Sequence, residues 1–217
     1  MLEQIIGKSS HPLSREDLLA RIAGYQAVHI DLGCGDGMLP YRRARENPHI
    51  FYIGIDAARE SLAVASAKAA KKPARGGCEN ALFLCMNLLE PNPDVTGIAD
   101  RLLFNFPWGS LMRAVADPDV PALQRLRALA KAQATFELYL NLYVFQNDKQ
   151  REDMNLPLVD AAFVQQILMP GWQAAGLAAE HWKMLPPATL QDHPSTWAGR
   201  LVRRSGRDTL FMEGTCT

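Results

Sequence analysis

Residues 31–37 read Asp-Leu-Gly-Cys-Gly-Asp-Gly and directly follow the apolar run 27–30, and a second apolar run ends in Gly54-Ile55-Asp56 about one βα unit later. Glycines after a buried parallel strand let the backbone approach a ligand closely, and an acid ending the next strand can bind two ribose hydroxyls. The pattern predicts a cofactor site at the carboxyl edge of an α/β sheet. The alternative is a tight turn whose glycines are there for steric reasons alone.

The charge of this loop indicates which cofactor it takes. A dinucleotide site uses G-x-G-x-x-G to bring a pyrophosphate to a helix N-terminus, whereas this loop is G-x-G-x-G flanked by Asp31 and Asp36. Carboxylates repel phosphates but attract an ammonium and a sulfonium. We therefore expect S-adenosylmethionine, which carries both cations and no phosphate.

The rest of the chain alternates between strand-like and helix-like segments, which predicts a doubly wound, mostly parallel sheet. A hairpin over 3–13 and a helix over 14–24 precede it. We expect strands at 27–32, 50–55, 81–86, 101–106, 135–142, 178–185 and within 209–213, and helices at 37–46, 59–71, 110–116, 121–132 and 160–169. Residues 146–157 read as an irregular linker, and Pro170-Gly171 as a helix stop.

Length and composition favour one domain over 1–217, with an N-terminal extension over 1–24 and linkers over 143–159 and 186–200 that face the cofactor or RNA. A hydrophobic content of 48% and a charged content of 21% are ordinary globular values, and no apolar run approaches a membrane span. The N-terminus lacks the pattern of a signal peptide, so we expect a cytoplasmic protein. Four cysteines without a C-x-x-C pair argue against zinc and against a disulfide framework.

Positive charge is gathered in two stretches although the formal net charge is zero. A formal net charge of zero argues against indiscriminate nucleic-acid binding. Each stretch reads either as a solvated face or, beside a methyl-donor site, as a surface for a phosphate backbone. The residues are Lys68, Lys71, Lys72 and Arg75, and then Arg200, Arg203, Arg204 and Arg207.

Two tryptophans are candidates for contact with a substrate base. Trp108 follows the strand that ends at Asn105-Phe106-Pro107, and Trp197 lies in a polar loop. An aromatic ring at the carboxyl edge of the sheet can stack on a purine flipped out of its helix. The alternative for Trp108 is a core residue after a strand, which is how we interpret Trp172 and Trp182.

At this point the chain resembles a known family. Residues 31–37, 52–56, 71–77, 106–109, 155–158 and 197–200 are similar, in order, to motifs of the aminoglycoside-resistance 16S rRNA (adenine(1408)-N(1))-methyltransferases of the kanamycin-apramycin type. The resemblance spans nearly the whole chain. It implies a class I methyltransferase fold, with a seven-stranded, mostly parallel, Rossmann-like sheet and an antiparallel last strand.

The resemblance also implies an activity and roles for residues. The family methylates N1 of a decoding-site adenine in the 30S subunit, using S-adenosylmethionine, and we expect a monomer. Trp108 and Trp197 would stack on the flipped base, and the two basic stretches would dock on folded RNA. The expected donor contacts are Asp31, Gly33, Asp36, Leu39, Asp56, Leu88, Leu89, Asn105, Phe106, Pro107, Trp108, Gly109, Ser110, Ser195, Thr196 and Trp197.

Two positions depart from the family pattern. Related proteins often have small and acidic residues where this chain has Asn87-Leu88-Leu89, so the donor's adenine contacts either these leucines or Glu90. A basic residue expected before the segment 156–158 is Met154, and Arg151 is the candidate to replace it.

Other functions remain open from the residues alone. Asn105-Phe106-Pro107-Trp108 approximates the Asn-Pro-Pro-aromatic motif of adenine-N6 methyltransferases, although Phe106 replaces the first proline. Methylation of tRNA guanine is a similar alternative, because the sheet order is shared. From another class, the chain could be a non-catalytic S-adenosylmethionine sensor or a ribosome-binding factor.

Overall fold

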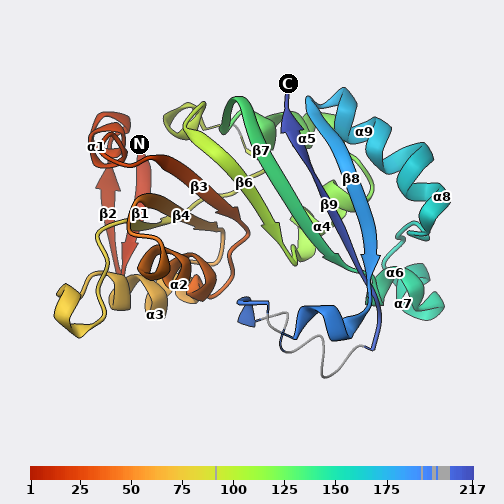
Figure 1. Ribbon diagram of the computed structural model, residues 1–217, viewed down its shortest axis with the longest axis horizontal. Helices are drawn as coiled ribbons and strands as arrows, with labels where there is room; N and C mark the ends of the chain where they lie inside the picture. Colours follow the sequence, from red (N-terminus) through yellow and green to blue (C-terminus); the bar gives the residue numbers. More distant parts are fainter. Residues whose placement is uncertain (91, 192, 197–198, 200–205) are drawn as a thin grey trace.

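The computed structural model describes residues 1–90, 92–191, 193–196, 199 and 206–217. Within these residues the centre is one twisted sheet of nine strands in the order β2-β1-β5-β4-β3-β6-β7-β9-β8 (Figure 1). The strands are β1 (Leu2–Ile6), β2 (Ser9–Leu13), β3 (Ala27–Leu32), β4 (Ile50–Asp56), β5 (Ala81–Cys85), β6 (Ala99–Asn105), β7 (Ala130–Asn141), β8 (Leu177–Leu185) and β9 (Thr209–Cys216).

The predicted parallel sheet is confirmed. Strand β3 pairs in parallel with β4 and β6, β4 pairs in parallel with β5, and β6 with β7. Strand β9 is antiparallel to both of its neighbours, β7 and β8. The order reverses beside β3, so the carboxyl ends of β3 and β6 bound a crevice where open α/β sheets bind ligands.

The predicted N-terminal hairpin forms and extends this sheet. Strands β1 and β2 pair as a hairpin around Gly7 and Lys8, and β1 also lies antiparallel to β5. The Gly7 amide donates a hydrogen bond to Ser66 Oγ at 3.0 Å, which joins the turn to helix α3 (Arg59–Ala69). The extension is thus built into the edge of the sheet.

Helices lie on both faces of the sheet. Helices α2 (Met38–Glu46) and α3 pack on β4 and β5 around a core that includes Ile5, Tyr41 and Phe83. The larger core, which includes Trp172, lies on the opposite face. Its helices are α1 (Arg15–Ile22), α4 (Gly109–Ala116), α5 (Val120–Arg127) and α9 (Met169–Ala174).

The prediction of an irregular linker over 146–157 was wrong. The chain forms α6 (Tyr143–Gln146) and α7 (Asp148–Asp153). Asn147 starts α7 as its N-cap, because its side chain accepts a hydrogen bond from the Gln150 amide at 3.1 Å. Val144 and Phe145 of α6 are buried, so a local cap and apolar contacts order a segment whose sequence lacks periodicity.

The predicted helix stop at Pro170-Gly171 was also wrong. Helix α8 (Ala161–Phe163) continues through the π-helical turn η3 (Val164–Leu168) into α9. Pro170 comes directly after the π-helical turn, where the regular pattern of α-helical hydrogen bonds is already interrupted, so its missing N–H costs less there. A Cβ on Gly171 would lie 2.5 Å from Pro118 Cγ, so this glycine serves a close approach to the segment before α5.

Residues 130–132 belong to β7 and not to the predicted helix over 121–132. Helix α5 ends at Arg127, and Ala130 then pairs with Ala99 of β6. The helix propensity of Ala-Lys-Ala is overridden by this pairing. The interpretation of Trp172 as a core residue is confirmed, since it is fully buried and its indole Nε1 donates to Val115 O at 3.0 Å. Trp182 is partly buried and packs against the same core.

None of the helices formed by the described residues is both long and apolar enough to span a membrane.

Candidate active site

The glycine loop joins β3 to α2 at the carboxyl edge of the sheet. Gly33 and Gly37 have φ values of 69° and 66°, in the left-handed region that favours glycine. A Cβ on Gly33 would lie 2.7 Å from Leu111 Cδ2, and one on Gly37 would lie 2.7 Å from Phe83 Cε1. Both conformation and space therefore require glycine, and the backbone is left open toward a ligand.

Asp56 ends β4 with its carboxylate fixed by two backbone amides. Gly35 N donates to Oδ2 and Ala58 N donates to Oδ1, each at 2.8 Å. Each carboxylate oxygen has a second lone pair, so the group can still accept hydrogen bonds from two adjacent hydroxyls. This is the geometry that binding of a ribose needs.

Asp31 lies below the loop and is almost completely buried. Asn105 Nδ2, at the end of β6, donates to Asp31 Oδ1 at 3.0 Å. Burial raises the pKa of Asp31 to about 7, against the lowering effect of the Asn105 hydrogen bond, and the charges of Glu137, Asp56 and Asp36 raise it further. A buried carboxylate surrounded by acids is a site for a cation.

These elements enclose a cavity of about 270 Å³. Seven of the predicted donor residues line it: Gly33, Asp56, Leu88, Leu89, Phe106, Trp108 and Ser110. Glu90 lies in a different cavity and accepts a hydrogen bond from Asn87 Nδ2 at 2.9 Å. Of the two options for the donor's adenine, this placement favours Leu88 and Leu89.

Other predicted donor residues lie outside the wall of this cavity. Asp36 Oδ1 accepts a hydrogen bond from Met38 N at 3.0 Å and so acts at the start of α2. Leu39 is buried in α2, and Asp31 and Asn105 form the buried pair described above. Pro107, Gly109, Ser195 and Thr196 do not line the cavity either. Trp197 lies outside the described residues.

The cavity also has lining residues that sequence reasoning missed: Gly35, Ala57, Met86, Asn87 and Leu111. Ala57 and Met86 directly follow the ends of β4 and β5, so the rule that ligands bind at the carboxyl ends of strands was a signal that could have found them. Leu111 carries no such signal. It faces the cavity because α4 packs against Gly33.

Trp108 is presented by a strained turn between β6 and α4. Phe106 has a φ of 53°, which is rare for a bulky residue, and its amide donates to Tyr139 O at 2.8 Å. The Trp108 side chain is 66% exposed although it lines the donor cavity. An exposed indole beside a cofactor cavity is suited to stacking on a planar substrate.

Residues 193–196 lie beside α2, the helix that follows the glycine loop. Arg42 of α2 donates to Pro194 O at 2.9 Å, and Ser195 is buried. Thr196 Oγ1 is buried and has no hydrogen-bond partner within the described part of the chain.

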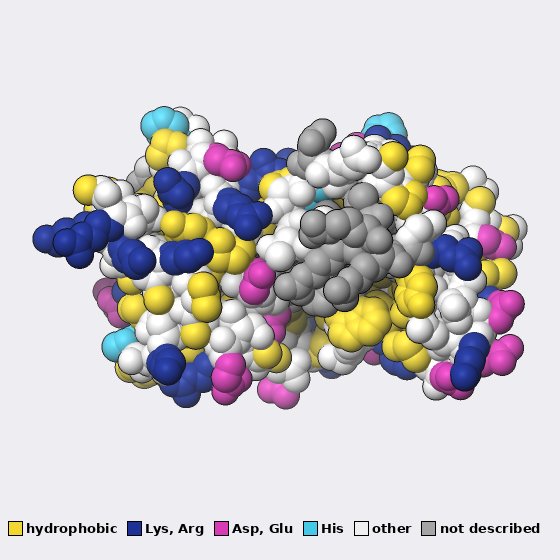
Figure 2. All heavy atoms as spheres, turned by 90° about the horizontal axis from the view of Figure 1, so that it is seen from below, with side chains coloured by type: hydrophobic (Ala, Val, Ile, Leu, Met, Phe, Trp, Pro, Cys, Tyr) yellow, Lys and Arg dark blue, Asp and Glu magenta, His cyan; other side chains and the backbone are white. Residues whose placement is uncertain are grey.

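The first basic stretch is exposed. Lys71, Lys72 and Arg75 are exposed, and Lys68 is partly buried with its Nζ 6.0 Å from the Tyr41 ring centroid. Figure 2 shows Lys and Arg side chains gathered on the side of α2 and α3, on the face seen from below. Arg207 is exposed as well, whereas Arg200, Arg203 and Arg204 lie outside the described residues. Arg151 pairs with Asp148 at 3.0 Å.

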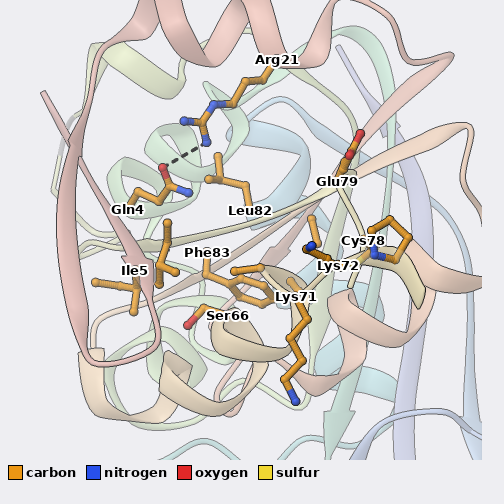
Figure 3. A pocket seen from close by; sticks show the side chains of 15 residues that line it. Gln4, Ile5, Arg21, Ser66, Lys71, Lys72, Cys78, Glu79, Leu82 and Phe83 are labelled. Carbon is orange, nitrogen blue, oxygen red and sulfur yellow. Dashed lines mark hydrogen bonds between the residues drawn. The ribbon is translucent and has the colours of Figure 1, made fainter. Parts of the chain in front are cut away.

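A larger cavity of about 460 Å³ lies away from the glycine loop, between the hairpin, α3 and β5. Figure 3 shows Gln4 and Arg21 joined by a hydrogen bond on one side of it, and Lys71 and Lys72 on the other. It is lined neither by the glycine loop nor by Asp56, so the smaller cavity is the one that matches the predicted donor site.

Comparison with known proteins decides the family. The family model described as "NpmA: 16S rRNA (adenine(1408)-N(1))-methyltransferase" matches residues 3–216. The chain belongs to this family. A curated NpmA-family relative from Escherichia coli, named 16S rRNA (adenine(1408)-N(1))-methyltransferase, is 32% identical over 96% of this chain and 95% of its own length. A relative of the same name from Streptoalloteichus tenebrarius is 31% identical and covers 99% of both chains.

Solved structures of the NpmA family agree with the fold. The aminoglycoside resistance methyltransferase NpmB1 superposes with a TM-score of 0.87 at 31% identity, and the 16S rRNA methyltransferase KamB with 0.89 at 29% identity. Each comparison covers 100% of both chains. The predicted family, class I methyltransferase fold and enzyme class are thereby confirmed.

Proposed function

We propose that the protein transfers a methyl group from S-adenosylmethionine to N1 of adenine 1408 of 16S rRNA in the assembled 30S subunit, and so confers aminoglycoside resistance. The observation that carries the proposal is the exposed Trp108 in the wall of the cavity that also holds the glycine loop and Asp56, in a chain of the NpmA family. The enzyme acts as a monomer, and its ribosomal substrate places it in the cytoplasm.

The residues of the cavity fit this donor. Asp56 lies in the wall and can accept hydrogen bonds from the ribose hydroxyls. Asp31 lies buried below the glycine loop, outside the wall, and its charge attracts the ammonium of the methionine part. Leu88 and Leu89 offer apolar surface to the adenine ring. The bound donor supplies an electrophilic methyl carbon on its sulfonium.

No general base is needed for this reaction. Adenine N1 is unprotonated at neutral pH and already nucleophilic, so catalysis consists of holding the base in line with the methyl carbon. Orientation of this kind can contribute about 7–11 kcal/mol in favourable cases. Methylation leaves a positive charge on the purine, and the faces of Trp108 and Trp197 stabilise it by about 0.5–2 kcal/mol each.

The buried pair of Asn105 and Asp31 argues against adenine-N6 methylation. That reaction depends on the side-chain oxygen of an Asn accepting a hydrogen bond from the target amino group. Here the Asn105 amide is buried and donates to Asp31, and Phe106 changes the turn that follows. Methylation of a ring nitrogen does not require an Asn side chain to accept a hydrogen bond from the target base.

Mapping the modified nucleotide on purified small subunits tests the proposal. After incubation with labelled S-adenosylmethionine, reverse transcription should stop at adenine 1408, because N1 methylation blocks pairing and N6 methylation does not. Resistance to kanamycin and apramycin should appear in a susceptible host that expresses the protein. Absence of the stop would refute the proposal.

Trp108→Ala and Trp197→Ala should each lower turnover by about ten-fold or more through loss of stacking, whereas the affinity for the donor should change much less. Trp182→Phe is the matched control, since Trp182 packs against the core on β8. Turnover is measured by incorporation of labelled methyl groups, and donor affinity by calorimetry. Full turnover in either alanine variant would show that the base is not held between two indoles.

A further inference from the structure

His193 connects the residues before Trp197 to the strands that hold Trp108. Its ring lies 5.5 Å from the Phe106 ring and 4.6 Å from the Tyr139 ring, edge to face in both cases. Phe106 and Leu190 belong to one small buried cluster, against which Tyr139 packs. The histidine is therefore fitted into an aromatic socket made by the ends of β6 and β7.

The same side chain also fixes the backbone that follows it. The Ser195 amide donates a hydrogen bond to His193 Nδ1 at 3.2 Å, so Nδ1 is an acceptor and the imidazole is neutral. Burial lowers the pKa of His193 to about 4, and the positive charge of Arg43 lowers it further. The ring thus stays neutral at physiological pH and keeps this acceptor.

The two contacts lie next to the two tryptophans in the sequence. Phe106 is two residues before Trp108, and Ser195 is two residues before Trp197. A third attachment comes from Arg42, which donates to Pro194 O at 2.9 Å. Arg42 lies in α2, the helix that begins directly after the glycine loop.

We propose that His193 is a positioning residue for the base site, with its ring and its Nδ1 atom together holding residues 193–196 against β6 and β7. It does not touch the reacting atoms. It fixes the position of residues 193–196, which directly precede Trp197, relative to the turn that carries Trp108. This role rests on the proposed function, because it assumes that both tryptophans hold the target base.

The two contacts can be removed separately. His193→Asn keeps an acceptor for the amide two residues ahead, as in an Asx-turn, but loses the ring. His193→Phe keeps a ring for the socket but loses the acceptor, and His193→Ala loses both. His181→Ala, at an exposed position on β8, is the control.

Turnover on small subunits should fall about ten-fold or more in His193→Ala, because a displacement of about 1 Å in an active site costs up to about 100-fold in rate. The turnover of His193→Asn and that of His193→Phe should each fall by only about three-fold, because each variant keeps one of the two contacts that His193→Ala loses. KM for small subunits and the donor dissociation constant should stay within about two-fold of wild type. His193 itself does not line the donor cavity, and Phe106, which does, keeps its own backbone hydrogen bond to Tyr139 O at 2.8 Å.

The proposal is overturned if His193→Ala keeps wild-type turnover, or if donor affinity falls as much as turnover, which would indicate a general structural role. If circular dichroism shows that His193→Ala does not fold, wild-type turnover in both other variants overturns it, and a loss in either supports it. A wild-type enzyme without the stop at adenine 1408 would instead refute the proposed function.

Discussion

Asp31 is the residue whose charge state is expected to couple donor binding to pH. It is 2% exposed and accepts a hydrogen bond from Asn105. Burial, with smaller contributions from neighbouring acids, raises its pKa to about 7. Without a donor, the stabilisation that this shift gives the folded state is present at low pH and is lost as the pH rises through about 7. A cation bound beside the carboxylate reverses that cost.

Donor binding is therefore expected to release a proton below pH 7. Affinity should rise by up to about ten-fold per pH unit as the pH approaches 7 from below, and should level off above it. Calorimetry at about pH 6, in buffers of different ionisation heat, measures the released proton. Asp31→Asn should abolish the release, whereas Asp36→Asn should keep it because Asp36 acts at the start of α2. An affinity independent of pH would contradict this coupling.

At the scale of elements, the loop between β3 and α2 is fixed by the space around Gly33 as well as by its conformation. Three glycines separate these effects. Gly24 has open space and no positive φ, Gly97 has open space and a φ of 69°, and Gly33 has the same φ with Leu111 in contact range of a Cβ.

Substitution of each glycine by alanine should therefore give graded results. Gly24→Ala should change the free energy of unfolding by less than about 1 kcal/mol. Gly97→Ala should cost about 1–2 kcal/mol because a Cβ strains the left-handed conformation. Gly33→Ala should cost more, since Leu111 must move, and only this variant should weaken donor binding. Thermal unfolding and calorimetry measure both effects, and equal costs for Gly97 and Gly33 would disprove the packing contribution.

Sequence patterns predicted the elements whose signal is local. Strand β3 and the start of α3 lie where apolar runs, glycines and spacing placed them. Helix α7 has a local signal in its N-cap Asn147, which was overlooked because the segment lacks apolar periodicity. The continuation of the helix through Pro170 could not be predicted in this way, because it depends on packing against Pro118. The same holds for the site. The pattern of acids and glycines predicted the donor cavity. The place of Leu111 in its wall and the contacts of His193 could not be predicted, because they form only when distant segments pack together.

At the scale of the whole molecule, the exposed basic stretch after α3 should act in docking on RNA. The double variant Lys71→Glu/Lys72→Glu should bind small subunits about ten-fold more weakly at low salt and show a shallower salt dependence. Donor affinity should not change, because neither lysine lines the donor cavity.

Arg125→Glu is the control for this prediction. Arg125 is exposed on α5, which lies at the top of Figure 1, away from the face seen in Figure 2. Filter binding over a range of salt concentrations measures both variants. Because the double variant makes two charge reversals and the control makes one, the losses are compared per reversal. Equal losses of binding free energy per reversal would indicate a general effect of charge and not a docking surface.

The outer strands of the sheet bear on how copies of the enzyme behave toward one another. Strand β2 is mostly exposed and contains Pro12, and β8 has an irregular register between Ala179 and His181. Proline and bulges at an edge hinder the addition of a strand from another molecule. These edges thus hinder strand pairing between copies, which we expect to protect a concentrated enzyme against fibril growth and to leave its surface accessible to the rRNA substrate.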